Sequence, residues 1–272
     1  MAAPDPVVVG AKNQRLRRLR RLTGRPKVRS QERAFVVDGP VLVAEVLRSS
    51  CEVQEVFGSA QELAADPVRS ALAERADVEV FQAETSVLVA QLDPVTPRAI
   101  AAVVTPPTWT AEDLGTDRPV LVAVELGDPG NLGTVIRTAE AAGFAGVVVA
   151  GDSVDWIAPK VVRASAGSLF RMPIVRFDDV VAAHEAIAAT GRPWYSAVVD
   201  QDAADYVDRD LTRAAIVVGN EPHGLAPEAI KLGDGRLTIP VADTVESLNV
   251  AAAASVLCFE AARQRRATAA RS

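Results

Sequence analysis

Apolar and polar positions alternate in a regular way through the second half of the chain. From Pro119 onwards, short apolar runs are separated by stretches in which apolar residues recur at helical spacing. The pattern predicts strands at 120–126, 146–150, 173–176, 196–199, 215–218 and 237–239, and helices at 132–142, 157–168, about 180–189 and from about Glu246. Strands that alternate with helices predict a parallel sheet covered on both faces, with ligands bound outside the carboxyl ends of its strands.

The first half shows a shorter version of the same alternation. Its pattern predicts strands at 35–37, 53–57, 78–81 and 100–104 and a helix at 41–48, which together make a small α/β domain. A stretch rich in Pro, Thr and charge then breaks the periodicity, as linkers do. We therefore expect an N-terminal domain at 1–107, a linker at 108–118 and a second domain at 119–272, in keeping with a length of 272 residues.

Charge changes the interpretation of the N-terminus. The net charge is -6, yet residues 12–29 hold nine Lys and Arg with no acidic residue, and Leu16, Leu19 and Leu22 recur among them at helical spacing. This pattern predicts a basic amphipathic helix. Such a helix can bind nucleic-acid phosphates, but it can equally be a solvated surface helix or a target of a calmodulin-like protein or a membrane surface.

Composition limits where the protein works. No apolar run approaches the roughly 20 residues needed to cross a bilayer, so we expect no membrane segment. The two cysteines, Cys51 and Cys258, lie in different halves, which is typical of a reduced, cytoplasmic protein. The Ala- and Arg-rich tail from Arg263 is expected to fray.

Three segments of the second domain carry candidate chemistry. The first, 127–137, leaves a strand and opens a helix with glycines at 127, 130 and 133, Asn131 near the helix start and Arg137 six residues later. Glycines permit close approach of a ligand, and a helix N-terminus favours anions. The segment is also compatible with a capped turn, or with a loose dinucleotide-binding motif in which Asp152 would bind ribose.

The second and third segments each follow a strand. Residues 216–225 form an apolar strand that ends in Gly219, Asn220 and Glu221, where a carboxylate can order an arginine or a hydroxyl, although a tight turn with an exposed acid has the same pattern. Residues 237–249 end with Ser247 and Asn249 before an alanine-rich helix, and either residue can cap that helix or face a ligand. A lone histidine at 223 makes a poor metal site, and we expect no metal.

Taken together, these segments resemble the three motifs of the SpoU/TrmH branch of the SPOUT RNA methyltransferases. The resemblance rests on Asn131-x-Gly-x-x-x-Arg137, Gly219-Asn-Glu221-x-x-Gly-Leu and Ile239-Pro, followed by Ser247-Leu-Asn249. It spans residues 119 to about 266. The N-terminal stretch also resembles the substrate-binding domain of ribosomal RNA members.

The resemblance implies a fold, a cofactor and a partner. The C-terminal α/β domain is expected to contain a trefoil knot around residues 219–249, in which S-adenosylmethionine binds, and a small α/β RNA-binding domain is expected to precede it. The family also implies a homodimer with the site near its interface, which suits the alanine-rich final helix.

The resemblance also implies roles for individual residues. It assigns Gly219, Ile239 and Leu248 to the cofactor and Asn131, Arg137, Glu221, Ser247 and Asn249 to catalysis. Because a guanidinium stays charged in proteins, we expect Arg137 to hold an RNA phosphate and to stabilise developing alkoxide charge. The candidate RNA-binding residues are Arg15, Arg17, Arg18, Arg20, Arg21 and Arg163.

The expected reaction is methyl transfer from S-adenosylmethionine to a ribose 2'-hydroxyl of RNA, with 23S ribosomal RNA preferred as the substrate. The alternatives are a transfer RNA 2'-O-methyltransferase and a noncatalytic RNA-binding or ribosome-assembly protein. A more distant alternative is a nicotinamide-dependent oxidoreductase, which would explain the first segment but leaves the other two without a role.

Overall fold

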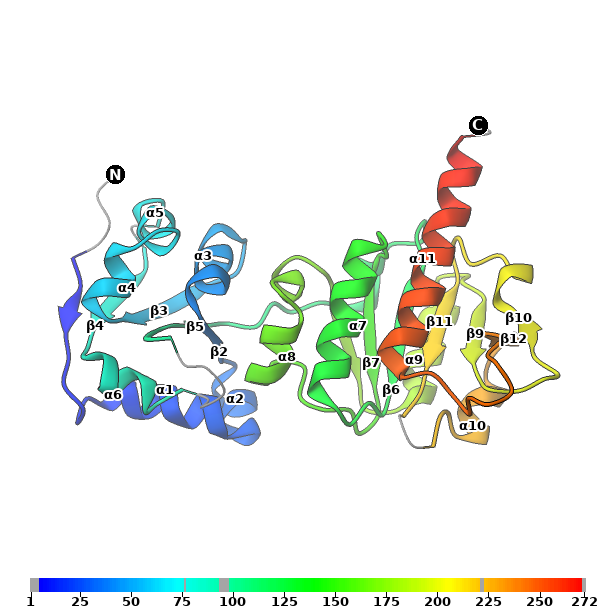
Figure 1. Ribbon diagram of the computed structural model, residues 1–272, viewed down its shortest axis with the longest axis horizontal. Coiled ribbons are helices and arrows are strands. Elements are labelled where there is room, and N and C mark those ends of the chain that lie inside the picture. Colours follow the sequence, from blue (N-terminus) through cyan, green and yellow to red (C-terminus); the bar gives the residue numbers. More distant parts are fainter. Residues whose placement is uncertain (1–4, 76, 93–97, 221–222, 271–272) are drawn as a thin grey trace. The chain divides into compact units, whose positions relative to one another are not determined.

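The computed structural model describes residues 5–75, 77–92, 98–220 and 223–270, which form two compact units (Figure 1). The N-terminal unit comprises Met1–Thr108 and Ile157–Arg171, and the C-terminal unit comprises Trp109–Trp156 and Met172–Ser272. Each unit contains its own β-sheet. Residues 157–171 therefore pack with the first half of the chain, although they lie between two strands of the second.

The sheet of the N-terminal unit has the strand order β1-β4-β3-β5-β2. Its strands are β1 Val7–Val8, β2 Phe35–Asp38, β3 Val53–Gly58, β4 Glu79–Gln82 and β5 Ile100–Val104. β5 pairs antiparallel with both β2 and β3, whereas β3, β4 and β1 run parallel. The four expected strands are confirmed, and β1 was not predicted because two residues carry no periodicity.

Short helices cover this sheet. They are α1 Gln14–Gly24, α2 Pro26–Glu32, α3 Pro40–Arg48, α4 Ala60–Ala64, α5 Val68–Ala73, α6 Thr85–Val89 and α8 Pro159–Ala164. The basic segment is two helices rather than one, because Arg25 adopts an extended conformation before Pro26. Leu16, Leu19 and Leu22 are fully buried in a core with Phe57 and other sheet residues, as the helical spacing predicted.

The sheet of the C-terminal unit has the order β10-β12-β9-β11-β6-β7-β8, and all its pairings are parallel. Its strands are β6 Val120–Val124, β7 Gly146–Ala150, β8 Ile174–Phe177, β9 Trp194–Ala197, β10 Ala204–Asp205, β11 Ala215–Val218 and β12 Gly235–Thr238. The expected parallel sheet is confirmed. β6 lies between β7 and β11, so the loops that follow these three strands emerge at one edge.

Helices cover both faces of this sheet. α7 Pro129–Ala141 and α11 Val250–Ala269 run side by side and pack on β6, β7 and β11 (Figure 1). α9 Val180–Ala188 packs on the other face, where Ala183 and Ile187 join the core residues of alternate sheet positions. α10 Pro227–Lys231 follows β11. Residues 109–118 belong to this unit, and their 3₁₀ turn Ala111–Leu114 buries Leu114 in its core.

Three expectations about helix ends are wrong, each for a local reason. The helix expected at 157–168 ends at Ala164, because Ala166 and Gly167 adopt left-handed backbone conformations with φ of 46° and 85°. The last helix begins at Val250 rather than near Glu246 because Asn249 caps it. Its tail is helical to Ala269 instead of frayed, and Arg265 Nη1 donates a 2.7 Å hydrogen bond to the carbonyl oxygen of Gly143.

Within the described residues, no helix is both long and apolar enough to span a bilayer. The trefoil knot implied by the family resemblance stays a prediction.

Candidate active site

The first candidate segment forms the N-terminus of α7. Asp128 caps the helix, and its carboxylate accepts a 2.9 Å hydrogen bond from the backbone N–H of Asn131. Pro129 takes the first helical position, where its missing N–H costs nothing. Arg137 lies about 9 Å further along the helix axis than Asn131. Its side chain is exposed and makes no hydrogen bond or ion pair with any described residue.

The end of β6 connects this segment to its neighbours. Glu125 has a left-handed backbone conformation with φ of 54°, which is uncommon for a residue with a side chain. Its N–H donates to the carbonyl oxygen of Ala150 at the end of β7. Its carbonyl oxygen accepts a 2.9 Å hydrogen bond from Nδ2 of Asn220, which follows β11. The turn at Glu125 therefore joins the carboxyl ends of three adjacent strands.

The second segment makes a tight backbone crossing after β11. A Cβ atom on Gly219 would lie 2.5 Å from the carbonyl carbon of Gly224 and 2.6 Å from the nitrogen of Leu225, so no larger residue fits here. Asn220 and Gly224 exchange backbone hydrogen bonds of 3.1 and 2.9 Å and close the turn. Glu221, a predicted catalytic residue, lies outside the described residues.

The third segment reaches back to the first through Asn249. The side-chain oxygen of Asn249 caps α11 by accepting hydrogen bonds from the N–H groups of Ala251 and Ala252, and its Nδ2 donates a 3.2 Å hydrogen bond to Oδ1 of Asn131. The sequence left capping and ligand contact as alternatives for Asn249. One amide now both caps the helix and connects two candidate segments. Ser247 is exposed and makes no hydrogen bond with the described residues.

A pocket of about 530 Å³ opens between the second and third segments. Gly219, Ile239 and Leu248, the three predicted cofactor residues, all line it, as do Ser247 and Asn249. The rest of its lining is mainly apolar, from Ala197, Val198, Val199, Val218, Leu225, Ile230, Leu237, Val241, Val250, Ala253 and Leu257. Two of its features suit a ligand that is partly apolar and partly polar: Leu248 is 38% exposed at the pocket, and Oδ1 of Asn220 is buried without a hydrogen-bond partner among the described residues.

Some pocket residues escaped the sequence prediction. Asn220 stands inside the Gly-Asn-Glu motif, so its neighbours could have indicated it. Val250, Ala253 and Leu257 of α11 could not be recognised, because their spacing is also that of an ordinary buried helix face. Among the described residues, no cluster of His, Cys, Asp and Glu has the arrangement of a metal site.

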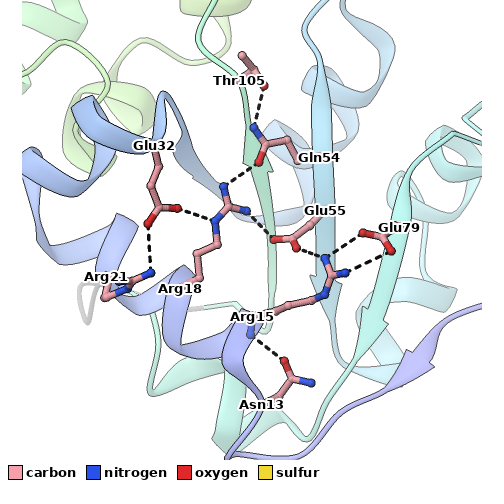
Figure 2. Close-up of polar contacts among 9 residues, drawn as sticks. All are labelled: Asn13, Arg15, Arg18, Arg21, Glu32, Gln54, Glu55, Glu79 and Thr105. Carbon is pink, nitrogen blue, oxygen red and sulfur yellow. Dashed lines mark hydrogen bonds and ion pairs between the residues drawn. The ribbon is translucent and has the colours of Figure 1, made fainter.

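The predicted RNA-binding arginines fall into two groups. Arg15, Arg18 and Arg21 form ion pairs with acidic residues of their own unit (Figure 2). Arg163 on α8 likewise pairs with Asp38, at 3.1 Å from Nη1 to Oδ2. In contrast, Arg17 and Arg20 are exposed, and their side chains have no hydrogen-bond or ion-pair partner among the described residues.

Two protein families match the two halves of this chain. Residues 118–259 match the SpoU rRNA Methylase family. Residues 13–102 match the MRM3-like substrate binding domain.

Individual relatives agree with these matches. The 23S rRNA (guanosine(2553)-2'-O)-methyltransferase RlmP of Bacillus subtilis is 32% identical over 253 residues, which cover 93% of this chain and 97% of the relative. The 23S rRNA (uridine(2479)-2'-O)-methyltransferase of Streptomyces viridochromogenes is 41% identical over 142 residues, half of each chain. The crystal structure of the SpoU methyltransferase AviRb from S. viridochromogenes with AdoMet superimposes with a TM-score of 0.84 at 29% identity, covering 94% of this chain and 99% of that one.

The fold and the site thus define an RNA methyltransferase with S-adenosylmethionine as its cofactor. The chain belongs to the SpoU rRNA methylase family. This confirms the family resemblance, the class of enzyme and the cofactor expected from the sequence, and it replaces the oxidoreductase alternative.

Proposed function

We propose that this protein transfers a methyl group from S-adenosylmethionine to a ribose 2'-hydroxyl of large-subunit ribosomal RNA. The observation that carries the proposal is the Asn249–Asn131 hydrogen bond at the edge of the pocket, because it brings two family motifs together beside the residues expected to bind the cofactor. The relatives that match almost the full length of the chain include an enzyme named for 23S rRNA. A solved structure described as methylating C/U34 of tRNA covers only 56% of this chain, whereas the AviRb structure covers 94%. The coverage favours ribosomal over transfer RNA.

The pocket fits the cofactor. Gly219 leaves room for close backbone approach, and Ile239 and Leu248 offer apolar contact. Oδ1 of Asn220, which has no hydrogen-bond partner among the described residues, can accept a hydrogen bond from an amino group. When bound, S-adenosylmethionine supplies an electrophilic methyl group on a sulfonium. The residues of this chain must therefore orient and activate a weak nucleophile, and positioning can contribute much of the barrier reduction.

The polar residues around the pocket divide this work. Asn131 is held by the Asn249 amide and lies at the N-terminus of α7, where a negative charge is favoured. Ser247, exposed and without a hydrogen bond to the described residues, can bond the ribose. Arg137 stays protonated and contacts an RNA phosphate, and its charge stabilises the negative charge that develops on the attacking 2'-oxygen. The phosphate or another acceptor takes the proton of the 2'-hydroxyl. Glu221 completes the proposed set by ordering a cation or a hydroxyl.

We further propose that the protein acts as a homodimer. Arg137 does not line the pocket of its own chain, and α11 exposes the side chains of Ala252, Val256 and Phe259 at helical spacing on one face. Phe259 is 49% exposed, and a second copy would cover it. Light scattering should give twice 28.6 kDa for the wild type, and Phe259→Glu should give the monomer mass. A monomeric wild type would contradict the dimer.

The proposed activity is tested by transfer of labelled methyl from S-adenosylmethionine to unmodified 23S ribosomal RNA, 16S ribosomal RNA and transfer RNA. We expect label on 23S ribosomal RNA and its loss in Arg137→Ala, with cofactor binding by calorimetry unchanged in that variant. Label on transfer RNA alone would overturn the substrate. The large-subunit substrate also implies a cytoplasmic location, where ribosomes are assembled.

A further inference from the structure

The basic segment at the N-terminus contains two kinds of cation that its sequence does not distinguish, besides Arg29, which is buried and donates hydrogen bonds to the carbonyl oxygens of Leu22 and Thr23. We name Arg15, Arg18 and Arg21 the inner arginines, and we name Lys12, Arg17, Arg20, Arg25 and Lys27 the outer cations. The inner arginines follow one another at intervals of three along one flank of α1. The outer cations are all exposed, and none of their side chains has a hydrogen-bond or ion-pair partner among the described residues.

The inner arginines are bound to acidic residues of the same unit. Glu55 on β3 has a side chain only 4% exposed, and it forms ion pairs with Arg15 and, at 3.0 Å, with Arg18 (Figure 2). Arg15 also pairs with Glu79 at 2.9 Å. Glu32 receives Arg18 at 2.7 Å and Arg21 at 3.1 Å. Three arginines therefore face three glutamates, and this flank of α1 carries no surplus charge.

These pairs are costly to open. Arg18 uses all three of its nitrogens, on Glu32, Glu55 and the side-chain oxygen of Gln54. Arg15 in addition lies over the Phe81 ring, 4.6 Å from its centroid, and hydrogen bonding to Glu55 raises the pKa of its guanidinium. If either arginine moved to an RNA phosphate, Glu55 would be left buried with less compensating charge, which is strongly unfavourable. The inner arginines are therefore poor candidates for RNA contact.

The outer cations have the opposite character. Arg17 and Arg20 are three residues apart on α1, so they are neighbours on the helix surface and repel each other. Nothing in the described part of the N-terminal unit neutralises them. A polyanion would remove this repulsion, and arginine suits phosphate because its planar guanidinium can form two parallel hydrogen bonds.

We propose that the outer cations form the surface of the N-terminal unit that binds the RNA phosphate backbone, and that the inner arginines serve only to hold α1 on the sheet. This proposal rests on the proposed RNA substrate. It moves the phosphate contacts away from three of the seven arginines in the basic segment. It also removes Arg163 from the RNA-binding set, because Arg163 forms an ion pair with Asp38 of the same unit.

The test measures binding of 23S ribosomal RNA transcript without S-adenosylmethionine, at several salt concentrations, so that it does not depend on methyl transfer. At 0.1 M salt, the variant Arg17→Gln/Arg20→Gln should bind the RNA at least about tenfold more weakly than the wild type. Removing two phosphate contacts should also reduce the slope of log Kd against log salt by about 1.4 to 1.8. The melting temperature of this double variant should equal that of the wild type.

Two matched variants provide the controls. Arg69→Gln/Arg98→Gln removes the same charge from exposed positions of this unit that already pair with Asp66 and Glu62, and it should leave the salt slope unchanged. Arg15→Gln/Arg18→Gln should lower the melting temperature but keep the wild-type slope. The proposal is overturned if the outer variant keeps the wild-type slope, or if the inner variant loses it while folded. It is also overturned if the outer variant weakens binding only to intact ribosomal particles, which would indicate an acidic protein as the partner.

Discussion

The flank of α1 with the inner arginines and the edge of the pocket differ in whether their polar groups have partners within the chain. On the α1 flank, a buried glutamate is compensated by two arginines, and every inner arginine has an acidic partner. At the pocket edge, Ser247 has no hydrogen-bond partner among the described residues, Leu248 is exposed and Oδ1 of Asn220 is buried without one. The side chain of Arg137, on α7 outside the pocket lining, also has no partner among the described residues. The first arrangement stabilises a fold, and the second leaves interactions for a ligand to make. Partners within the chain, rather than residue type, thus separate structural from functional groups.

The largest effect should follow removal of the exposed cation of α7. Arg137→Ala should lower the rate of methyl transfer by about 10²- to 10³-fold, the scale measured when one charge-stabilising group is lost. Because the Arg137 side chain has no partner among the described residues, the melting temperature of the variant should change only as much as in ordinary surface substitutions. Arg176→Ala, which removes another exposed arginine of the same unit, should keep full activity. If Arg137→Lys retained near-normal turnover, planar bidentate contact would not be needed.

The next effect concerns the backbone crossing at the pocket. In Gly219→Ala, the new Cβ would meet backbone atoms of Gly224 and Leu225 at 2.5 to 2.6 Å, so the turn must shift. We expect at least about tenfold weaker S-adenosylmethionine binding by calorimetry, the result of about 1.4 kcal/mol of lost interaction. Gly10→Ala is the matched control, because nothing lies within 4 Å of its Cβ position. Equal cofactor affinity in both variants would place the cofactor elsewhere.

The substitution Glu55→Gln tests the flank of α1 that carries the inner arginines. Loss of the buried carboxylate leaves Arg15 and Arg18 less compensated, and we expect about 1 to 3 kcal/mol lower stability to urea, because both arginines are partly exposed and can recover solvation. Calorimetric binding of S-adenosylmethionine should be unchanged, since its pocket lies in the other unit. Unchanged stability would show that the inner arginines do not hold α1 in place.

The smallest effect is a pH dependence on α11. Hydrogen bonding to Arg263 lowers the pKa of Glu260 below its ordinary value of 4.5. A lowered folded-state pKa gives stability that is complete above the unfolded pKa and is lost as the pH falls through the folded value. Glu260→Gln should therefore be less stable than the wild type at pH 7, by less than about 1 kcal/mol, and the difference should vanish well below pH 4.5. A difference that grew on acidification would contradict this assignment.

The sequence was informative where a pattern is local. The parallel sheet followed from strands alternating with helices, and the pocket residues Gly219, Ile239 and Leu248 followed from motif resemblance. The sequence-based prediction was wrong where a single backbone conformation determines the end of a helix, as at Gly167, whose left-handed conformation helps to end α8 early. It could not separate Arg15 from Arg17, because the acids that bind Arg15 come from strands 40 and 64 residues away.

Steady-state methyl transfer to 23S ribosomal RNA by the wild type, Ser247→Ala and Arg17→Gln/Arg20→Gln compares the two regions most directly. If unpartnered groups in the C-terminal unit serve catalysis and those in the N-terminal unit serve binding, Ser247→Ala lowers kcat with little change in the KM for RNA. The double variant then raises that KM severalfold and keeps kcat within about twofold. Wild-type protein that transfers no methyl group to ribosomal RNA, or two variants that change the same kinetic parameter, would contradict the account.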